Sequence, residues 1–301
     1  DIGSADASFL LACRTLEPEC RVPFPPEDAV VFLRLAADRG HAEAAYQLAC
    51  CYAAIGQYKN TEQACANYFN SIESRERSRL AEHYFHIAAN ANHREAIEEL
   101  IIAYAYGRGF VAKDASQFSA LCEKLVTQDD QAVALGYGAW LAGMTVEGEP
   151  PLPDAIHLPP NYQKSLDCLM MGAIGANVEL AQHALHLICI GIYRGIWDNL
   201  PAGKLAKTLH ETVEAGNQLL ALYFAWYSIP LHRRCPMPEL LDQQQLTQLS
   251  GFVEQDETKA MNYLDKVLLG ANAHLSAIAK ELLLQVFGFG TGAIEIELLA
   301  N

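Results

Sequence analysis

The stretch AANANHREA at residues 88–96 repeats, with few changes, the stretch AADRGHAEA at residues 36–44. Counted from Gly40 and Asn92, both copies continue with a small residue at +4, leucine at +8 and tyrosine at +12. Steps of four residues keep side chains on one face of a helix. Each copy therefore predicts the end of one helix, a tight turn and the start of a second helix.

The residue types explain how such a turn would be built. Glycine and asparagine can adopt the left-handed conformation that ends a helix. Alanine at the start of the second helix lets two backbones approach closely, and the leucine and tyrosine further along fill the widening gap. A single hairpin cannot bury its apolar face, so neighbouring hairpins must stack on one another.

The same register recurs more loosely after Gln128, Asn177, Asn217 and Asn272. The intervals between these anchors are unequal, and the longer ones predict insertions. The repeats thus predict an all-α fold, a right-handed α-solenoid of about five to six antiparallel helix pairs with irregular loop insertions. Residues 1–26 are expected to form an N-terminal capping helix and linker, and residues 27–301 a single solenoid.

Two proline-rich segments predict the main loops. Residues 147–161 read EGEPPLPDAIHLPPN, and residues 230–238 read PLHRRCPMP. So many prolines exclude a continuous helix. At the C-terminus, residues 293–300 alternate briefly like a strand, although a short capping helix is favoured.

One unit resembles a known repeat family closely. Residues 88–114, which end in YAYGRGFVAKD, follow the pattern A-x-x-x-L-x-x-x-Y-x-x-G-x-G of the Sel1-like repeats, a TPR-like α-solenoid family. The unit at Gly40 departs from this pattern at Ile55 and Gly56, and the remaining units keep it only in part. The resemblance implies a scaffold that binds other proteins.

Composition excludes several classes of function. The chain carries 36 acidic against 21 basic residues, a net charge of −15, so it is expected to repel nucleic acid. A partner protein with a basic patch is more plausible, although the charge also keeps an apolar-rich chain in solution. No apolar run is long enough to predict a transmembrane segment.

The nine cysteines include no CxxC pair, which argues against a zinc ribbon or a thioredoxin-type site. Cys13 and Cys20, or Cys51 and Cys65, are placed to form local disulfides. Because the chain does not begin with methionine, a periplasmic or otherwise exported location is expected, with the cytoplasm as the alternative.

No catalytic signature for a serine hydrolase, a zinc protease or a nucleotide-binding enzyme is present, and no cofactor is predicted. The best metal candidates are Glu179, His183 and His186, which share one helix face. Glu82, His83 and His86 repeat part of this spacing. In both sets, histidines bonded to backbone or water are the simpler explanation.

Aromatic side chains are the better candidates for a binding surface. Tyr52, Tyr104 and Trp140 share one repeat position and are expected to wedge between helices. Aromatics outside that register are expected to face the concave surface and anchor a partner. The predicted binding residues, including those of the two loops, are Tyr106, Trp197, Tyr227, Glu147, Glu149, Asp154, His157, Arg233 and Arg234.

The expected function is a non-catalytic protein-binding scaffold or adaptor. The family resemblance includes immunity proteins that neutralise secreted lipase-type toxins, for example those of type VI secretion, and an acidic solenoid fits a toxin with a basic cleft. An envelope-assembly or signalling adaptor is one alternative. A metal-dependent enzyme that uses Glu179, His183 and His186 is the other.

Overall fold

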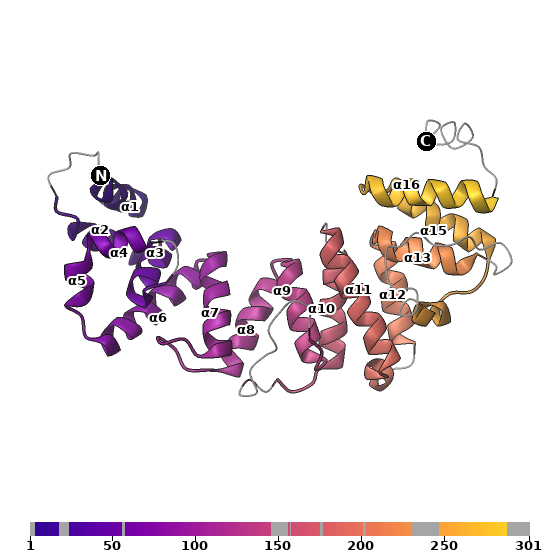
Figure 1. Cartoon of the computed structure of the whole chain (residues 1–301), viewed down its shortest axis with the longest axis horizontal. Coiled ribbons are helices and arrows are strands. Elements are labelled where there is room, and N and C mark those ends of the chain that lie inside the picture. Colours follow the sequence, from indigo (N-terminus) through magenta and orange to yellow (C-terminus); the bar gives the residue numbers. More distant parts are fainter. Residues whose placement is uncertain are drawn as a thin grey trace. The chain divides into compact units, whose positions relative to one another are not determined.

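The computed structural model describes residues 4–17, 24–55, 58–145, 156, 158–174, 177–200, 203–229 and 247–287. Within these ranges every regular element is a helix (Figure 1). The chain divides into two compact units. Unit 1 consists of Asp1–Leu125 and Leu152–Leu158, and unit 2 consists of Val126–Pro151 and Pro159–Asn301.

Unit 1 contains two helix hairpins, α2–α3 and α6–α7. Helix α1 packs against α2, and α3 packs against α6, so each hairpin covers the apolar face of its neighbour. Two short helices, α4 and α5, connect the hairpins, and α8 follows the second one. The bounds are α1 (Ala5–Leu16), α2 (Asp28–Ala37), α3 (Ala42–Ala53), α4 (Lys59–Ala64), α5 (Ala66–Asn70), α6 (Ser74–Asn90), α7 (Arg94–Tyr106) and α8 (Ala115–Val126).

Unit 2 repeats this arrangement. Helix α9 packs against the hairpin α10–α11, and the hairpins α12–α13 and α15–α16 follow. Residues Leu219–Ala225 of α13 are all buried, because α15 and neighbouring helices cover this helix. The bounds are α9 (Gln131–Leu141), α10 (Tyr162–Ile174), α11 (Val178–Tyr193), η1 (Ile196–Asn199), α12 (Lys204–Glu214), α13 (Gln218–Ser228), η3 (Thr247–Phe252), α15 (Glu257–Leu269), α16 (Ala273–Leu282) and η4 (Leu283–Phe287).

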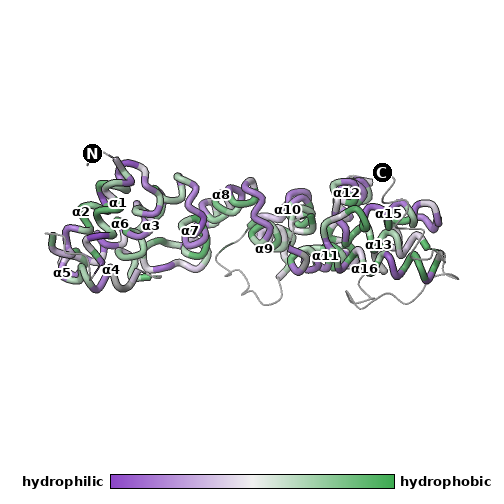
Figure 2. Tube along the Cα trace, turned by 90° about the horizontal axis from the view of Figure 1, so that it is seen from above, coloured by the Kyte–Doolittle hydropathy of each residue, from purple (hydrophilic) through white to green (hydrophobic). Residues whose placement is uncertain are grey.

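The predicted all-helical repeat fold is confirmed. The described ranges contain five hairpins within the two units, and hydrophobic and hydrophilic stretches alternate along their helices (Figure 2). The predicted N-terminal helix is α1. None of the helices in the described ranges has the length and apolar character of a membrane span. Most of the loop at 147–161, all of that at 230–238 and the tail at 293–300 lie outside these ranges.

The turns inside the hairpins correct part of the sequence interpretation. Gly40 and Asn92 adopt the left-handed conformation as predicted, with φ of +87° and +62°. Asn177, Asn217 and Asn272 do not, because each is the N-cap of the second helix and its side chain accepts hydrogen bonds from the first turn. Asparagine suits both positions, so the repeat pattern cannot separate them.

The third turn also differs from the prediction. The left-handed residue there is Asp129, with φ of +60°, and not Gln128. Asp130 then caps α9 by accepting a hydrogen bond from the Val133 N–H. Counted from their N-caps, the helices α3, α7, α9, α11, α13 and α16 therefore share one register. The sequence anchors were misplaced by one residue for four of them.

Glutamines join successive turns within unit 2. Gln131, the first residue of α9, donates to the Gly172 and Asn177 carbonyls at 2.6 and 3.1 Å and accepts from the Asn177 N–H. Gln218, the first residue of α13, donates to the Val267 carbonyl at 2.6 Å and accepts from the Asn272 N–H at 2.9 Å. These bonds satisfy backbone groups that the helix ends leave without partners.

The structure does not form the predicted Cys51–Cys65 disulfide. Both thiols are free and buried, and the Cys65 thiol donates to the Pro26 carbonyl at 3.1 Å. Burial raises the pKa of the Cys65 thiol to about 11, which makes it a poor nucleophile at neutral pH. Cys13 is also a free thiol, and Cys20 lies outside the described residues.

Candidate protein-interaction surface

The predicted aromatic anchors separate into exposed and buried residues. Tyr106, the last residue of α7, is 39% exposed. Trp197 and Tyr227 are only 3% and 5% exposed, so the prediction that they face a partner is wrong. The other predicted binding residues, Glu147, Glu149, Asp154, His157, Arg233 and Arg234, lie outside the described residues.

Trp197 is buried because the chain folds back after α11. Its indole N–H donates to the Ile188 carbonyl at 3.2 Å, and its ring lies directly against the backbone of Gly191. Tyr227 is buried because α13, on which it lies, is covered by other helices of unit 2. Position relative to the repeat pattern therefore did not predict exposure.

Among the described residues of unit 2, the exposed aromatic is Tyr193, at 76% exposed, which was not among the residues predicted to bind a partner. It is the last residue of α11 and is followed closely by Gly195 in the left-handed conformation. Tyr106 likewise precedes the left-handed Gly107. An aromatic residue just before a helix-ending glycine is thus the sequence pattern from which the exposure of Tyr106 and Tyr193 could have been predicted.

In unit 1, Tyr106 belongs to a stripe of exposed and partly exposed side chains along α7. Residues Glu95, Glu98, Glu99, Ile102 and Tyr106 follow one another at steps of one to four and lie on the side opposite the buried stripe; we call them the α7 face. Ile102 is 38% exposed, so the C-terminal half of this face is apolar and its N-terminal half is acidic.

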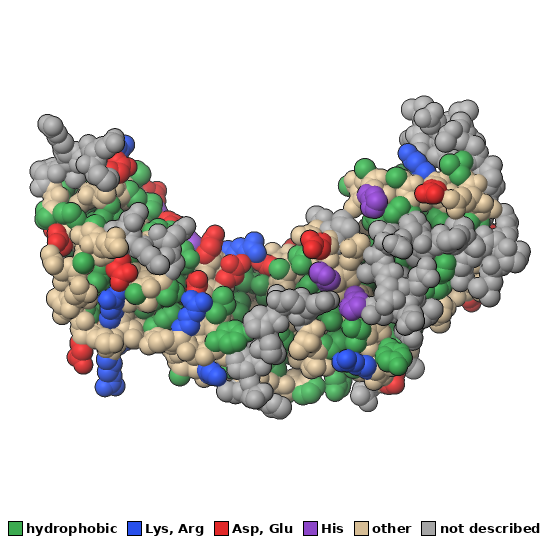
Figure 3. All heavy atoms as spheres, in the orientation of Figure 1, with side chains coloured by type: hydrophobic (Ala, Val, Ile, Leu, Met, Phe, Trp, Pro, Cys, Tyr) green, Lys and Arg blue, Asp and Glu red, His purple; other side chains and the backbone are tan. Residues whose placement is uncertain are grey.

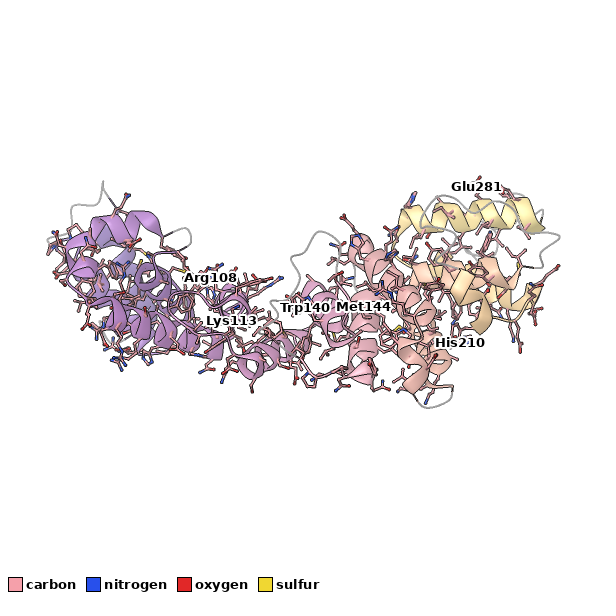
Figure 4. All side chains as sticks on the ribbon, turned by 60° about the horizontal axis from the view of Figure 1, so that its bottom comes forward. Arg108, Lys113, Trp140, Met144, His210 and Glu281 are labelled. Atoms are coloured by element: carbon pink, nitrogen blue, oxygen red, sulfur yellow. The ribbon has the colours of Figure 1, made fainter. Side chains whose placement is uncertain are left out.

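Ion pairs frame the apolar half of the α7 face. Arg108, which follows the last turn of α7 (Figure 4), pairs with Glu99 at 2.6 Å, and both side chains are partly buried. Arg94 pairs with Glu98 at 2.8 Å one turn apart. Figure 3 shows acidic and basic side chains interspersed on the visible face of unit 1. Two of the three glutamates of this face, Glu98 and Glu99, are thus paired with arginines, and the Glu99 pair is the less exposed of the two.

The N-terminal end of the α7 face contains a histidine between two carboxylates. The Nε2 atom of His93 lies 2.9 Å from Glu43, and its Nδ1 atom lies 3.3 Å from Glu95 without the geometry of a hydrogen bond. The ring stacks on Tyr46 at a centroid distance of 4.5 Å. Glu43 also accepts a hydrogen bond from the Tyr58 hydroxyl. This cluster joins the turn of one hairpin to the next.

These contacts set the charge state of Glu43. Burial raises the pKa of its carboxyl, but the hydrogen bonds from His93 and Tyr58 and the charges of His93 and His41 lower it more, so the pKa lies below its ordinary value. A carboxyl with a lowered pKa in the folded state stabilises the protein above its unfolded pKa of about 4.3, and this contribution is lost as the pH falls through the folded pKa.

Glu43→Gln is therefore expected to lower the free energy of unfolding at pH 7 by about 1 kcal/mol or less, because Glu43 is partly exposed. The loss should shrink towards pH 3, where the wild-type carboxyl is itself protonated. Urea unfolding of both proteins at several pH values measures this difference. A matched control is Glu95→Gln, which removes no hydrogen bond; a loss that did not change with pH would contradict the assignment.

The metal candidates are not assembled. Within the described ranges, no group of three or more histidine, cysteine, aspartate or glutamate side chains is placed to hold a metal ion. This applies to Glu179, His183 and His186, of which the first two are exposed on α11. It also applies to Glu82, His83 and His86, where His86 instead bonds to the Tyr104 hydroxyl at 2.8 Å.

No protein-family model matches the chain, and no curated protein matches it. Among solved structures, it is similar to a Sel1 repeat protein from Oxalobacter formigenes, with 16% identity, a TM-score of 0.42 and coverage of 93% of this chain and 87% of that one. It is also similar to a protective antigen of uropathogenic Escherichia coli strains that has an SLR fold, with 14% identity, a TM-score of 0.31 and coverage of 94% and 62%. Sel1 repeats are also the family that residues 88–114 resemble.

Proposed function

We propose that this protein is a non-catalytic scaffold that binds a partner protein through the α7 face. The observation that carries the proposal is that Ile102 and Tyr106, two exposed apolar side chains on one helix, lie on the same helix as two ion-paired glutamates. Exposed aromatic and aliphatic anchors surrounded by polar groups are typical of binding hot spots. Stacked helix hairpins supply the rigid support that such a surface needs.

The charges of this surface favour a basic partner. Glu98 and Glu99 are each paired with an arginine, but Glu95 on the α7 face and Glu43 beside it are not, and the whole chain has a net charge of −15. Opposite charges steer association and fix the orientation of a complex. Within this proposal, the partner is a protein with a basic cleft, such as a secreted lipase-type toxin that the chain neutralises.

The partner can be identified by photo-crosslinking. A photoreactive amino acid at position 106 is expected to capture one protein in the producing cells, and the same amino acid at position 193 serves as the control on a more exposed tyrosine of unit 2. Mass spectrometry of the crosslinked product names the partner. The proposal is rejected if position 193 captures the same protein as efficiently as position 106.

Tyr106→Ala is expected to weaken binding of that partner by about tenfold or more, because truncating a hot-spot aromatic residue typically costs about 2 kcal/mol or more. Isothermal titration calorimetry with the purified partner measures the change, and Tyr193→Ala is expected to leave the affinity unaltered. Affinity should also fall as salt is raised. Unchanged affinity in both Tyr106→Ala and Ile102→Asp would show that the partner binds elsewhere.

A further inference from the structure

A second surface of unit 1, separate from the α7 face, contains a polar pocket. Its volume is about 480 Å³, which is within the range of small-molecule sites. Helices α2 and α6 form its walls, and only one of its lining residues is aliphatic. The lining residues are Arg34, Asp38, Arg79, Leu80, Glu82, His83, Tyr84 and His86.

Arg34 is the notable cation of this pocket, because no carboxylate among the described residues forms an ion pair with it. Tyr84 lines the same pocket, and its phenol interacts electrostatically with the guanidinium. Tyr84 is itself fixed, since it is 2% exposed and stacks on Tyr52 at 5.8 Å, and Tyr52 in turn bonds to the Tyr68 hydroxyl at 3.1 Å. Among the residues that the structure describes, no ion pair neutralises Arg34, so its charge is available to a ligand.

Arg79, the other cation of the pocket, is already occupied. Its guanidinium forms two hydrogen bonds with Glu76, at 2.7 and 2.8 Å. A bidentate pair of this kind satisfies both the charge and the geometry of an arginine. Of the two guanidinium groups that line the pocket, that of Arg34 is therefore the one without a carboxylate partner, and an incoming carboxylate would bind there.

The same pocket also contains carboxylates without a cationic partner. Asp38 lies one turn after Arg34, and no described basic group pairs with it. Glu82 accepts only a long hydrogen bond of 3.5 Å from Tyr104, whose hydroxyl is also bonded to His86. Burial lowers the pKa of His86, so its ring is neutral at pH 7 and does not offset Glu82.

We infer that this pocket binds a small zwitterion, a free amino acid or a short peptide, whose carboxylate contacts Arg34 and whose ammonium group contacts Asp38 and Glu82. A guanidinium binds a carboxylate through two parallel hydrogen bonds. Phosphate or another multiply charged anion is disfavoured, because two carboxylates line the same space. A simple cation would leave Arg34 without a partner.

The test is calorimetric titration of the purified full chain with each standard L-amino acid, with glycylglycine, and with acetate and methylammonium as ligands that carry one charge only. At least one amino acid or the dipeptide is expected to bind saturably, and acetate and methylammonium are expected not to bind at the same concentrations. The comparison of amino acids with glycylglycine shows whether the natural ligand is a free amino acid or a peptide.

Variants assign the binding to this pocket. Arg34→Gln and Asp38→Asn are each expected to weaken binding by about tenfold or more. Tyr84→Phe removes a hydroxyl that lines the pocket together with Arg34 and is expected to weaken binding with the fold retained. Arg75→Gln is the matched control, because Arg75 is exposed on α6 but does not line this pocket.

Three outcomes overturn the inference. They are the absence of saturable binding by any amino acid or the dipeptide, binding that Arg34→Gln leaves intact, and acetate binding as tightly as the best amino acid. Thermal unfolding of each variant confirms that lost binding is not lost folding. No residue of the α7 face lines the pocket, so the outcome of this test does not depend on the proposed scaffold function.

Discussion

Gly191→Ala is expected to lower the free energy of unfolding of unit 2 by about 3–5 kcal/mol, comparable to the truncation of a large buried aromatic residue. A Cβ atom at this position would lie 2.5 Å from the Cε2 and Nε1 atoms of Trp197. Since the contact is with the indole ring itself, which is 3% exposed, a small rotation cannot relieve it. The tryptophan must leave its site, and its hydrogen bond to the Ile188 carbonyl is lost with it.

Urea unfolding followed by circular dichroism measures this loss, and two controls define its origin. Gly251→Ala places a methyl group in open space and is expected to change stability by less than about 0.5 kcal/mol. In a Trp197→Ala background, Gly191→Ala should cost much less than in the wild type, because the two residues act on each other. Additive losses would show that the glycine matters for another reason, such as helix propensity.

The Gly191–Trp197 contact also explains why exposure was mispredicted. Trp197 lies outside the repeat register and was therefore predicted to be at the surface. Because Gly191 has no Cβ, the Trp197 ring of η1 can pack directly against α11. An isolated glycine inside an apolar helix often marks such a close approach, and this was the signal that the repeat pattern obscured.

The hairpins were predictable because they depend on short-range patterns. Steps of four residues, small residues at close approaches and an asparagine or glycine at the turn are visible within about fifteen residues of sequence. The exact role of each turn residue was not predictable from these patterns. Asn92 ends a helix because its backbone is left-handed, whereas Asn217 caps the start of a helix with its side chain. In the second case Gly216, with φ of +98°, takes the left-handed position instead.

The candidate surfaces were less predictable, because they depend on contacts between distant segments. Tyr106 was identified from the sequence, but the exposure of Ile102 depends on which helices cover α7. The polar pocket requires Arg34 of α2 to lie beside Tyr84 of α6, fifty positions further along the chain. Glu82, His83 and His86 were noticed only as a possible metal set, and their place in a pocket with Arg34 could not be derived from helical spacing.

Asn217→Ala is expected to destabilise the protein by about 2–3 kcal/mol, whereas Asn272→Ala at the equivalent N-cap should cost about 1 kcal/mol. Both side chains accept hydrogen bonds from the first turn of their helices. Asn217 is in addition 4% exposed and donates its amide N–H to the Ala173 carbonyl. That carbonyl belongs to the last turn of α10, where no helical donor is available, so the alanine variant leaves it buried and unsatisfied.

Asn217→Asp separates the two roles. The carboxylate keeps the N-cap acceptor but loses the N–H donor. It also places a negative charge against the carbonyl of Ala173, a residue that is 1% exposed. Its loss of stability in urea unfolding is therefore expected to be at least as large as that of Asn217→Ala, although aspartate is as good an N-cap as asparagine. If the aspartate variant were instead as stable as the wild type, capping alone would account for Asn217, and the bond from one hairpin to the next would contribute nothing to the stacking of the repeats.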